Sequence, residues 1–229
     1  MEQISQAIIL AAGVGKRLRP YTDNCPKPLL KVDGQPAIER MIQQFTAKDM
    51  HVIVITGYMH EKFEYLTSKF KNVTLVYNDQ YDVRNNAFSL YCAKEFLNTP
   101  TIICDADQVF ANENILTTVS QSGYYVALQT EASSEWAVTV TDDHQILDCR
   151  RGHDSMAYII RSLSYWTTAD VLRLSQALSC FSFNDCSKYW DDIPLFDNCS
   201  QFKLKAYIQS GLQEFDTVKE YEKLKGCQS

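Results

Sequence analysis

The residues best placed to do chemistry lie in a short, basic, glycine-rich segment near the N-terminus. The segment LAAGVGKRLRP occupies residues 10–20 and follows a short apolar run. Its two glycines permit a tight turn and a close approach of the backbone to a ligand, and backbone N–H groups in such a loop can cradle phosphate oxygens. Lys16, Arg17 and Arg19 add three positive charges within four residues. We therefore expect this loop to bind a phosphorylated ligand.

Two common phosphate-binding loops do not fit this segment. The dinucleotide-binding pattern G-x-G-x-x-G needs a third glycine at position 18, where Leu18 stands. The P-loop pattern G-x-x-x-x-G-K-[ST] fails as well, because Leu10 replaces its first glycine and Arg17 replaces its hydroxyl residue. A different kind of phosphate site is therefore expected.

A pair of carboxylates follows another apolar run further along the chain. Asp105 and Asp107 come directly after a predicted strand, and the carboxyl ends of parallel strands are where open α/β sheets bind ligands. Carboxylate oxygens suit Mg²⁺, which usually takes one or two of them together with substrate phosphates. The alternative is that one aspartate begins a helix over 111–122. Asp191 and Asp216 are the candidates for a second ligand, although Asp216 also fits the N-cap of the last predicted helix.

A longer string around the glycine loop resembles the signature of the nucleotidyltransferases that make NDP-sugars and related activated alcohols. The string reads L-A-A-G-x-G-x-R-x-x-P at residues 10–20 and continues to the Pro-Lys-Pro-Leu-Leu run at 26–30. The resemblance implies that the loop wraps a nucleoside triphosphate, that Arg17 contacts the leaving pyrophosphate and that Lys27 reaches the α-phosphate. It also implies that Asp107 is the first ligand of a catalytic Mg²⁺ ion.

The remaining motifs resemble the bacterial CTP:phosphocholine cytidylyltransferases over nearly the whole chain. They are the Asn85-Asn86 pair, the Asp105-Ala-Asp107 turn, Glu135-Trp136 and Tyr189-Trp190-Asp191. The resemblance implies CTP as the nucleotide, with the asparagine pair at the base-binding end and Asp191 as the second Mg²⁺ ligand. An asparagine amide offers both a donor and an acceptor to a base, but either asparagine could instead cap the helix that follows.

The acceptor implied by this resemblance carries a cationic head. A quaternary ammonium has no N–H group, so aromatic faces and carboxylates must hold it. Phosphocholine enzymes tend to have a small Ser-Gly step before the strand that ends in an aromatic pair, here Tyr165-Trp166. This chain has Arg161 in that stretch instead. Because of that departure, the acceptor could be phosphocholine, phosphoethanolamine or 2-aminoethylphosphonate. The aromatic residues are alternatively core packing, and Arg161 is alternatively a solvated strand residue. The predicted acceptor-binding residues are Glu135, Trp136, Arg161, Tyr165, Tyr189 and Trp190.

The implied reaction transfers CMP to an aminoalkyl phosphate or phosphonate and releases pyrophosphate. A phosphate monoester is already largely a dianion at neutral pH, so we expect no general base and expect alignment and charge neutralisation to supply the catalysis. Lys27, Arg17 and Asp107 are the predicted catalytic residues, and Asp107 and Asp191 are the predicted metal ligands. The predicted nucleotide-binding residues are Leu10, Ala11, Ala12, Gly13, Val14, Gly15, Lys16, Arg17, Lys27, Asn85, Asn86, Ser89 and Ala106.

Alternating strands and helices must position these residues. Buried strands are predicted from apolar runs at 7–10, 52–56, 73–77 and 101–104, and helices from helix-period patterns at 37–49, 59–70 and 86–96. This alternation indicates right-handed crossovers and a mainly parallel, Rossmann-like α/β sheet flanked by helices.

From about residue 122 the pattern changes to strands joined by turns, which indicates antiparallel additions that form the substrate side. Strands are predicted at 124–130, 137–141, 146–149, 157–166 and 205–209, and helices at 167–178, near 187–196 and at 217–225. Because no linker separates the halves, we predict one domain over 1–229. Its nucleotide-binding part covers about 1–122 and its acceptor-binding part about 123–229.

The composition narrows the range of partners. The 229 residues include 22 Lys+Arg and 28 Asp+Glu, a net charge of −6, which disfavours nucleic acid. No apolar run approaches ~20 residues, so we expect no membrane span. The eight cysteines lack zinc-site or disulfide-scaffold spacing and favour a reduced, cytoplasmic protein. Two alternative functions stay open: an NDP-sugar pyrophosphorylase and a non-catalytic nucleotide-binding subunit. Fusion to, or cooperation with, another enzyme of its pathway also stays open.

Overall fold

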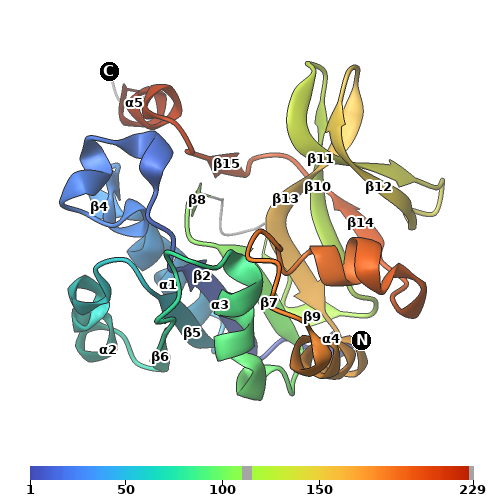
Figure 1. Ribbon diagram of the computed structural model, residues 1–229, viewed down its shortest axis with the longest axis horizontal. Helices are drawn as coiled ribbons and strands as arrows, with labels where there is room; N and C mark the ends of the chain where they lie inside the picture. Colours follow the sequence, from blue (N-terminus) through green and yellow to red (C-terminus); the bar gives the residue numbers. More distant parts are fainter. Residues whose placement is uncertain (110–114, 227–229) are drawn as a thin grey trace.

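The centre of the molecule is a parallel sheet whose strands are ordered β7-β2-β5-β6 (Figure 1). The computed structural model describes residues 1–109 and 115–226. The four central strands are β2 (Gln6–Ala11), β5 (His51–Thr56), β6 (Val73–Tyr77) and β7 (Thr101–Asp105), and each neighbouring pair is parallel. Every residue of β2 is buried, as expected for a strand in a parallel sheet that is covered on both faces.

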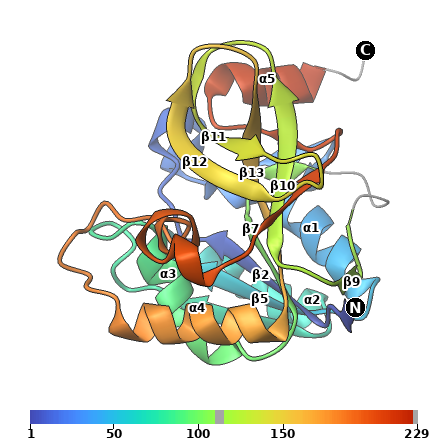
Figure 2. The same cartoon turned by 90° about the vertical axis from the view of Figure 1, so that its right-hand side faces the viewer.

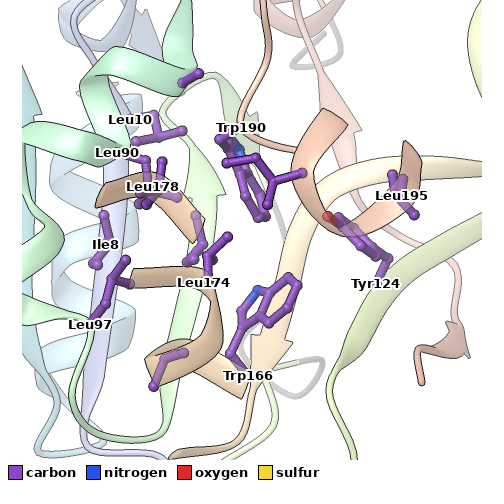
Figure 3. Packing of buried hydrophobic residues seen from close by; sticks show 14 of the residues in the cluster. Ile8, Leu10, Leu90, Leu97, Tyr124, Trp166, Leu174, Leu178, Trp190 and Leu195 are labelled. Carbon is purple, nitrogen blue, oxygen red and sulfur yellow. The ribbon is translucent and has the colours of Figure 1, made fainter. Parts of the chain in front are cut away.

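Helices cover the two faces, and alternate side chains of each strand meet different helices. On one face, Ile9 and Val54 pack with α1 (Ala37–Thr46) and α2 (Tyr65–Lys69). On the other face, Ile8 and Leu10 pack with α3 (Asn86–Cys92) and α4 (Thr168–Cys180). Figure 3 shows Leu90, Leu174 and Leu178 gathered against Ile8 and Leu10 in this second layer.

A second group of strands extends the sheet beyond β7. These strands are β10 (Gly123–Gln129), β11 (Ser133–Val140), β12 (Ile146–His153), β13 (Ala157–Trp166) and β14 (Lys205–Ile208). The long strand β13 runs antiparallel to β7 through its last residues and to β11 through its first, and it also pairs with β10. The β11–β12 hairpin consequently rises away from the layered half of the molecule (Figure 2).

The C-terminal segment returns from β14 to the N-terminal half of the chain (Figure 1). Its two-residue strand β15 (Gln213–Glu214) pairs with β8 (Gln108–Val109). Helix α5 (Val218–Gly226) follows, and its Tyr221 packs with Phe215 and Leu18 in a small third cluster. The remaining short strands are β1 (Glu2–Gln3) with β9 (Thr118–Val119) and β3 (Lys31–Val32) with β4 (Gln35–Pro36).

The expected α/β architecture is confirmed, but three predicted helices differ. The helix predicted over 59–70 is a 3-10 turn at His60–Phe63 followed by the short α2. The helix predicted over 111–122 is wrong from 115 on, where β9 pairs with β1; residues 110–114 lie outside the described residues. Of the helix predicted near 187–196, only a π-helical turn at Ile193–Asp197 forms, with Pro194 inside it. Within the described residues, every helix is too short or too polar to cross a lipid bilayer.

Candidate active site

A cavity of about 530 Å³ lies at the carboxyl ends of β2 and β7, where an open α/β sheet binds ligands. Every predicted nucleotide-binding residue lies on its wall, so strand β2, the glycine loop, the Asp105–Asp107 turn and the start of α3 converge here. The wall consists of Leu10, Ala11, Ala12, Gly13, Val14, Gly15, Lys16, Arg17, Lys27, Pro28, Tyr81, Asp82, Arg84, Asn85, Asn86, Ser89, Asp105, Ala106, Asp107, Glu135, Ile160, Ser162, Glu214 and Asp216.

The glycine loop is held in a conformation that depends on Gly15. Gly15 has a φ of 66°, in the left-handed region that glycine enters without strain. A Cβ there would lie 3.1 Å from Thr22 Cγ2 and 3.2 Å from Lys27 Cβ, and the Thr22 hydroxyl donates to the Gly15 carbonyl at 2.9 Å. The following 3-10 turn buries Leu18 and leaves Lys16 and Arg17 exposed. The loop is therefore anchored, with its cations directed away from the core.

Lys27 joins the two acidic groups of the site. Its Nζ lies 2.5 Å from Asp107 Oδ2 and 2.6 Å from Asp216 Oδ1, and Arg17 Nη2 lies 2.9 Å from the same Asp216 oxygen. Burial alone would lower the pKa of Lys27, but the charges and hydrogen bonds of Asp107 and Asp216 outweigh burial and raise the pKa. Burial acts to raise the pKa of Asp216, and Lys27 and Arg17 together hold it below its ordinary value. Lys27 is thus a fixed positive charge on the wall of the cavity.

The pairing of β8 with β15 brings the two aspartates together. Gln108 pairs with Glu214, and Val109 pairs with Gln213, so Asp107 and Asp216 flank the same short antiparallel ladder. The first residues of α5 cap the segment, because the backbone N–H groups of Asp216 and Thr217 donate to the Glu220 carboxylate. Asp216 is therefore held by secondary structure on both sides.

The structure places Asp216, and not the predicted Asp191, beside Lys27 and Asp107. Asp191 accepts a hydrogen bond from the Tyr124 hydroxyl at 2.9 Å and does not line the cavity. Burial raises the pKa of Asp191 to about 7. Asp191 therefore lies beside Tyr124, off the cavity wall but close enough to Asp105 for its charge to raise the pKa of that carboxyl, and its role as the second metal ligand stays a prediction.

A second acidic group forms another part of the cavity wall. Burial, reinforced by the charge of Asp107, raises the pKa of Glu214 to about 7, although Arg161 opposes the shift. Burial and the charges of Asp107 and Asp191 raise the pKa of Asp105 well above its ordinary value. Arg161 Nη1 donates to Glu214 Oε2 at 3.1 Å and is not on the wall. The predicted role of Arg161 as an acceptor contact stays a prediction, with its guanidinium paired to a carboxylate of the cavity wall.

The asparagine pair begins helix α3. The Asn85 side chain accepts the Asn86 backbone N–H at 2.8 Å as the N-cap of the helix, and its amide donates to the Ser187 carbonyl at 3.0 Å. Asn86 Oδ1 accepts the Trp190 backbone N–H at 3.0 Å. Ser89 accepts from Asn78 at 3.0 Å. The alternative capping role of Asn85 is thus present, and all three predicted residues still line the cavity.

The predicted aromatic residues divide into two groups. Tyr165 is fully buried beside Tyr207, and Trp190 is 4% exposed and stacks on Tyr124 with ring centroids 6.0 Å apart. Figure 3 shows Trp190 and Trp166 within this interior cluster. Direct acceptor roles for Tyr165 and Trp190 are corrected to core packing. Trp136 and Tyr189 instead meet at 5.6 Å and stay partly exposed.

Comparison with known proteins identifies the family. The model of the MobA-like NTP transferase domain matches residues 7–161. The chain belongs to the MobA-like NTP transferase family. It is 35% identical over 232 residues to the choline-phosphate cytidylyltransferase of Streptococcus pneumoniae, covering 96% of each chain. It is 34% identical over 199 residues to the 2-aminoethylphosphonate cytidylyltransferase of Lancefieldella rimae, covering 82% of this chain and 78% of that one.

A solved structure of a related enzyme has the same fold over nearly the whole chain. The CTP:phosphocholine cytidylyltransferase from Streptococcus pneumoniae (LicC) superposes with a TM-score of 0.88 and 31% identity, covering 97% of this chain and 98% of that one. This MobA-like NTP transferase is therefore a nucleotidyltransferase, as the motifs of the glycine loop predicted.

The acidic groups of this NTP transferase fit a magnesium ion. Asp107 and Asp216 contact one ammonium group, at 2.5 and 2.6 Å, so their oxygens already face a common point. Among residues 1–109 and 115–226, no three His, Cys, Asp or Glu side chains form a complete metal site. Two carboxylates with substrate phosphates are the usual environment of Mg²⁺ in phosphoryl-transfer sites, and the donors present match that pattern.

The cavity wall of the NTP transferase also includes residues to which the sequence analysis gave no role. Tyr81, Asp82 and Arg84 line the cavity before α3, and Glu214 lines it from β15. The first three belong to the polar run that precedes the asparagine pair, which was a detectable signal. Glu214 stands two residues before Asp216, but nothing in that local pattern predicts its pairing with Gln108.

Proposed function

We propose that this NTP transferase moves CMP from CTP to an aminoalkyl phosphate or phosphonate and releases pyrophosphate. The observation that supports this proposal is the meeting of Lys27, Asp107 and Asp216 beside the glycine loop in one cavity. Two relatives of high coverage act as cytidylyltransferases on choline phosphate and on 2-aminoethylphosphonate. The acceptor class follows from these relatives and from the acidic wall that includes Glu135 and Glu214.

The chemical step is an in-line displacement at the α-phosphorus of CTP. An oxygen of the acceptor phosphate or phosphonate forms a bond to that phosphorus, and the bond to the bridging oxygen of the β-phosphate breaks. The electron pair leaves with pyrophosphate. Because a phosphate monoester is already largely a dianion at neutral pH, the step needs no general base, and alignment with charge neutralisation supplies the acceleration.

Three basic residues neutralise the phosphates in this proposal. Lys27 exchanges its carboxylate partners for the α-phosphate, and Arg17 and Lys16 bind the pyrophosphate as negative charge develops on it. The backbone N–H groups of the glycine loop, held open by Gly15, bind the same phosphates. Asp107 and Asp216 would hold Mg²⁺, which would supply charge neutralisation at the phosphates. Asn85, Asn86 and Ser89 form the base-binding end of the cavity.

The experiment is a matrix of nucleotides and acceptors read by pyrophosphate release. CTP, UTP, GTP and ATP are each paired with phosphocholine, phosphoethanolamine, 2-aminoethylphosphonate and glucose 1-phosphate. We expect turnover with CTP and at least one amino-containing acceptor, and we expect it to stop when EDTA removes divalent cations. Preferred use of UTP with glucose 1-phosphate would contradict the proposal, as would the release of no pyrophosphate under any pairing.

A further inference from the structure

Two partly exposed aromatic rings, Trp136 and Phe196, lie against a cation that belongs to the protein. We name Trp136, Tyr189 and Phe196 the aromatic cluster; Trp136 lies 5.6 Å from Tyr189 and 5.4 Å from Phe196 between ring centroids. The guanidinium carbon of Arg151 lies 4.9 Å from the Trp136 ring centroid and 5.5 Å from that of Phe196. Both distances are within the range of cation–π attraction.

Backbone pairing and a buried carboxylate hold Arg151 in this position. Arg151 stands opposite Trp136 in the β11–β12 ladder, so the two side chains share one face of the hairpin. Its Nη2 donates to Asp192, whose side chain is 1% exposed. Asp192 also accepts the backbone N–H of Tyr189 at 3.0 Å. The guanidinium is thus anchored at one end by charge and lies against the rings at the other.

The aromatic cluster adjoins the cavity at two points. Glu135 lines the cavity and directly precedes Trp136. Asn86 also lines it and binds the backbone N–H of Trp190, next to Tyr189. The aromatic cluster therefore begins next to the cavity wall, and Trp136 packs against the same hydrophobic cluster as Ile160 of that wall.

We propose that Arg151 is a specificity-determining residue that favours acceptors with a primary ammonium over those with a quaternary one. This inference rests on the proposed function. A primary ammonium has three N–H donors that the carboxylates of Glu135 and Glu214 can accept. A quaternary ammonium has none and depends on aromatic faces. Arg151 already lies against the ring faces of Trp136 and Phe196. A quaternary ammonium must therefore first displace this guanidinium, which is held by its ion pair with Asp192.

The test compares acceptors that differ only in N-methylation. kcat/KM with CTP is measured for phosphocholine and phosphoethanolamine, and for 2-aminoethylphosphonate and its N-trimethyl analogue, in wild type, Arg151→Gln and the control Arg150→Gln. Arg150 is the exposed neighbour in β12 and stands opposite Ala137 instead of Trp136. In whichever pair the enzyme uses, the wild type should favour the primary amine. Arg151→Gln should raise the quaternary-to-primary ratio on the order of 3- to 30-fold, the strength of one cation–π contact, and Arg150→Gln should not change it.

The ratio separates a role in specificity from a role in stability. An unchanged ratio, an equal loss for both acceptors, or a wild type that prefers the quaternary acceptor would each overturn the inference while CTP turnover still supports the proposed function. Failure of the wild type with every acceptor would instead remove the proposed function itself. Thermal denaturation checks folding. If Arg151→Gln unfolds because Asp192 is left unpaired, the same ratio is read in the Arg151→Gln/Asp192→Asn variant, which removes both charges.

Discussion

Lys27 has two roles that follow from its contacts. With the cavity free of substrate, its ammonium separates two carboxylates that would otherwise repel one another across a partly buried site. During the proposed reaction the same ammonium is needed at the α-phosphate. Because the side chain is only 13% exposed, water screens neither interaction strongly. A single residue therefore connects the stability of the free enzyme to the chemistry of the proposed reaction.

Lys27→Met separates these two roles. We expect kcat to fall by about 10²–10³-fold, the usual cost of one transition-state contact, and the melting temperature to fall because Asp107 loses its cation while Asp216 keeps only Arg17. Millimolar Mg²⁺ should then raise the melting temperature of the variant more than that of the wild type. Differential scanning fluorimetry with and without Mg²⁺ measures this effect, and the exposed Lys71→Met serves as the control. A variant that keeps most of its activity, or that Mg²⁺ does not stabilise further, would contradict the assignment.

Replacing each candidate second ligand, Asp216 or Asp191, by asparagine should lower the activity in one variant and leave it nearly unchanged in the other. Asp216→Asn replaces a carboxylate that contacts Lys27, and we expect kcat/KM for CTP to fall by about 10²–10³-fold. Asp191→Asn keeps an oxygen that can accept from Tyr124, so we expect most of the activity to remain. Pyrophosphate release at several Mg²⁺ concentrations tests both variants, with the Mg²⁺ requirement shifted upward only in Asp216→Asn. The reverse order of the two losses would favour Asp191 as the second metal ligand.

At the scale of the elements, the pairing of the two-residue strands β8 and β15 brings distant residues into one site. No local sequence pattern predicts this pairing. The string around Lys27 and the turn at Asp107 could be recognised because their residues are neighbours in sequence. Asp216 reaches them only through the β8–β15 pairing, and a strand of two residues has no detectable period. Asp191 was predicted from a local motif, whereas its hydrogen bond to the distant Tyr124 has no sequence signal. Long apolar strands were predictable; short pairings between distant segments were not.

At Gly123, the backbone of β10 lies so close to the backbone of β14 that no side chain fits between them. A Cβ there would lie 2.0 Å from the carbonyl oxygen of Lys205 in the neighbouring strand β14. Gly123→Ala should therefore separate β10 from β14 and destabilise the protein by about 3 kcal/mol or more. Gly13→Ala is the matched control, since its Cβ would meet nothing within 4 Å, and its effect on stability should stay within about 0.5 kcal/mol. Urea denaturation measures the free energy of unfolding of both variants. Equal values would contradict the prediction and show that β14 can shift away from β10 without loss of stability.

At the scale of the whole molecule, residues 1–109 and 115–226 form two large hydrophobic clusters and one small one. The large clusters lie on the two faces of the sheet, in keeping with the predicted sheet flanked by helices. The small cluster joins Leu18, behind the glycine loop, to Phe215 and Tyr221 in the C-terminal segment. No sequence pattern indicated that the last helix would return to the first loop. This return puts Asp216 and Arg17 within 2.9 Å of each other.

Tyr221→Ala tests whether the small cluster positions the site without supporting the rest of the fold. Tyr221 is buried, its hydroxyl donates to the Lys31 carbonyl at 3.0 Å, and its ring packs on Tyr21 and Phe215. Its loss should release α5 locally, because opening a small unit costs less than global unfolding. Displacement of Asp216 should lower kcat/KM by about 10- to 100-fold.

Hydrogen exchange should speed up in α5 while the β2 and β5 amides stay protected, and the melting temperature should fall only slightly. Tyr77→Ala, which removes a tyrosine that is 49% exposed on β6, should change neither activity nor exchange in α5. A large fall in melting temperature together with faster exchange in β2 would mean that the C-terminal helix is part of the main folding unit. Unchanged activity with a released α5 would mean that Asp216 does not depend on the small cluster. This second result would separate the geometry of the proposed metal site from the return of the chain.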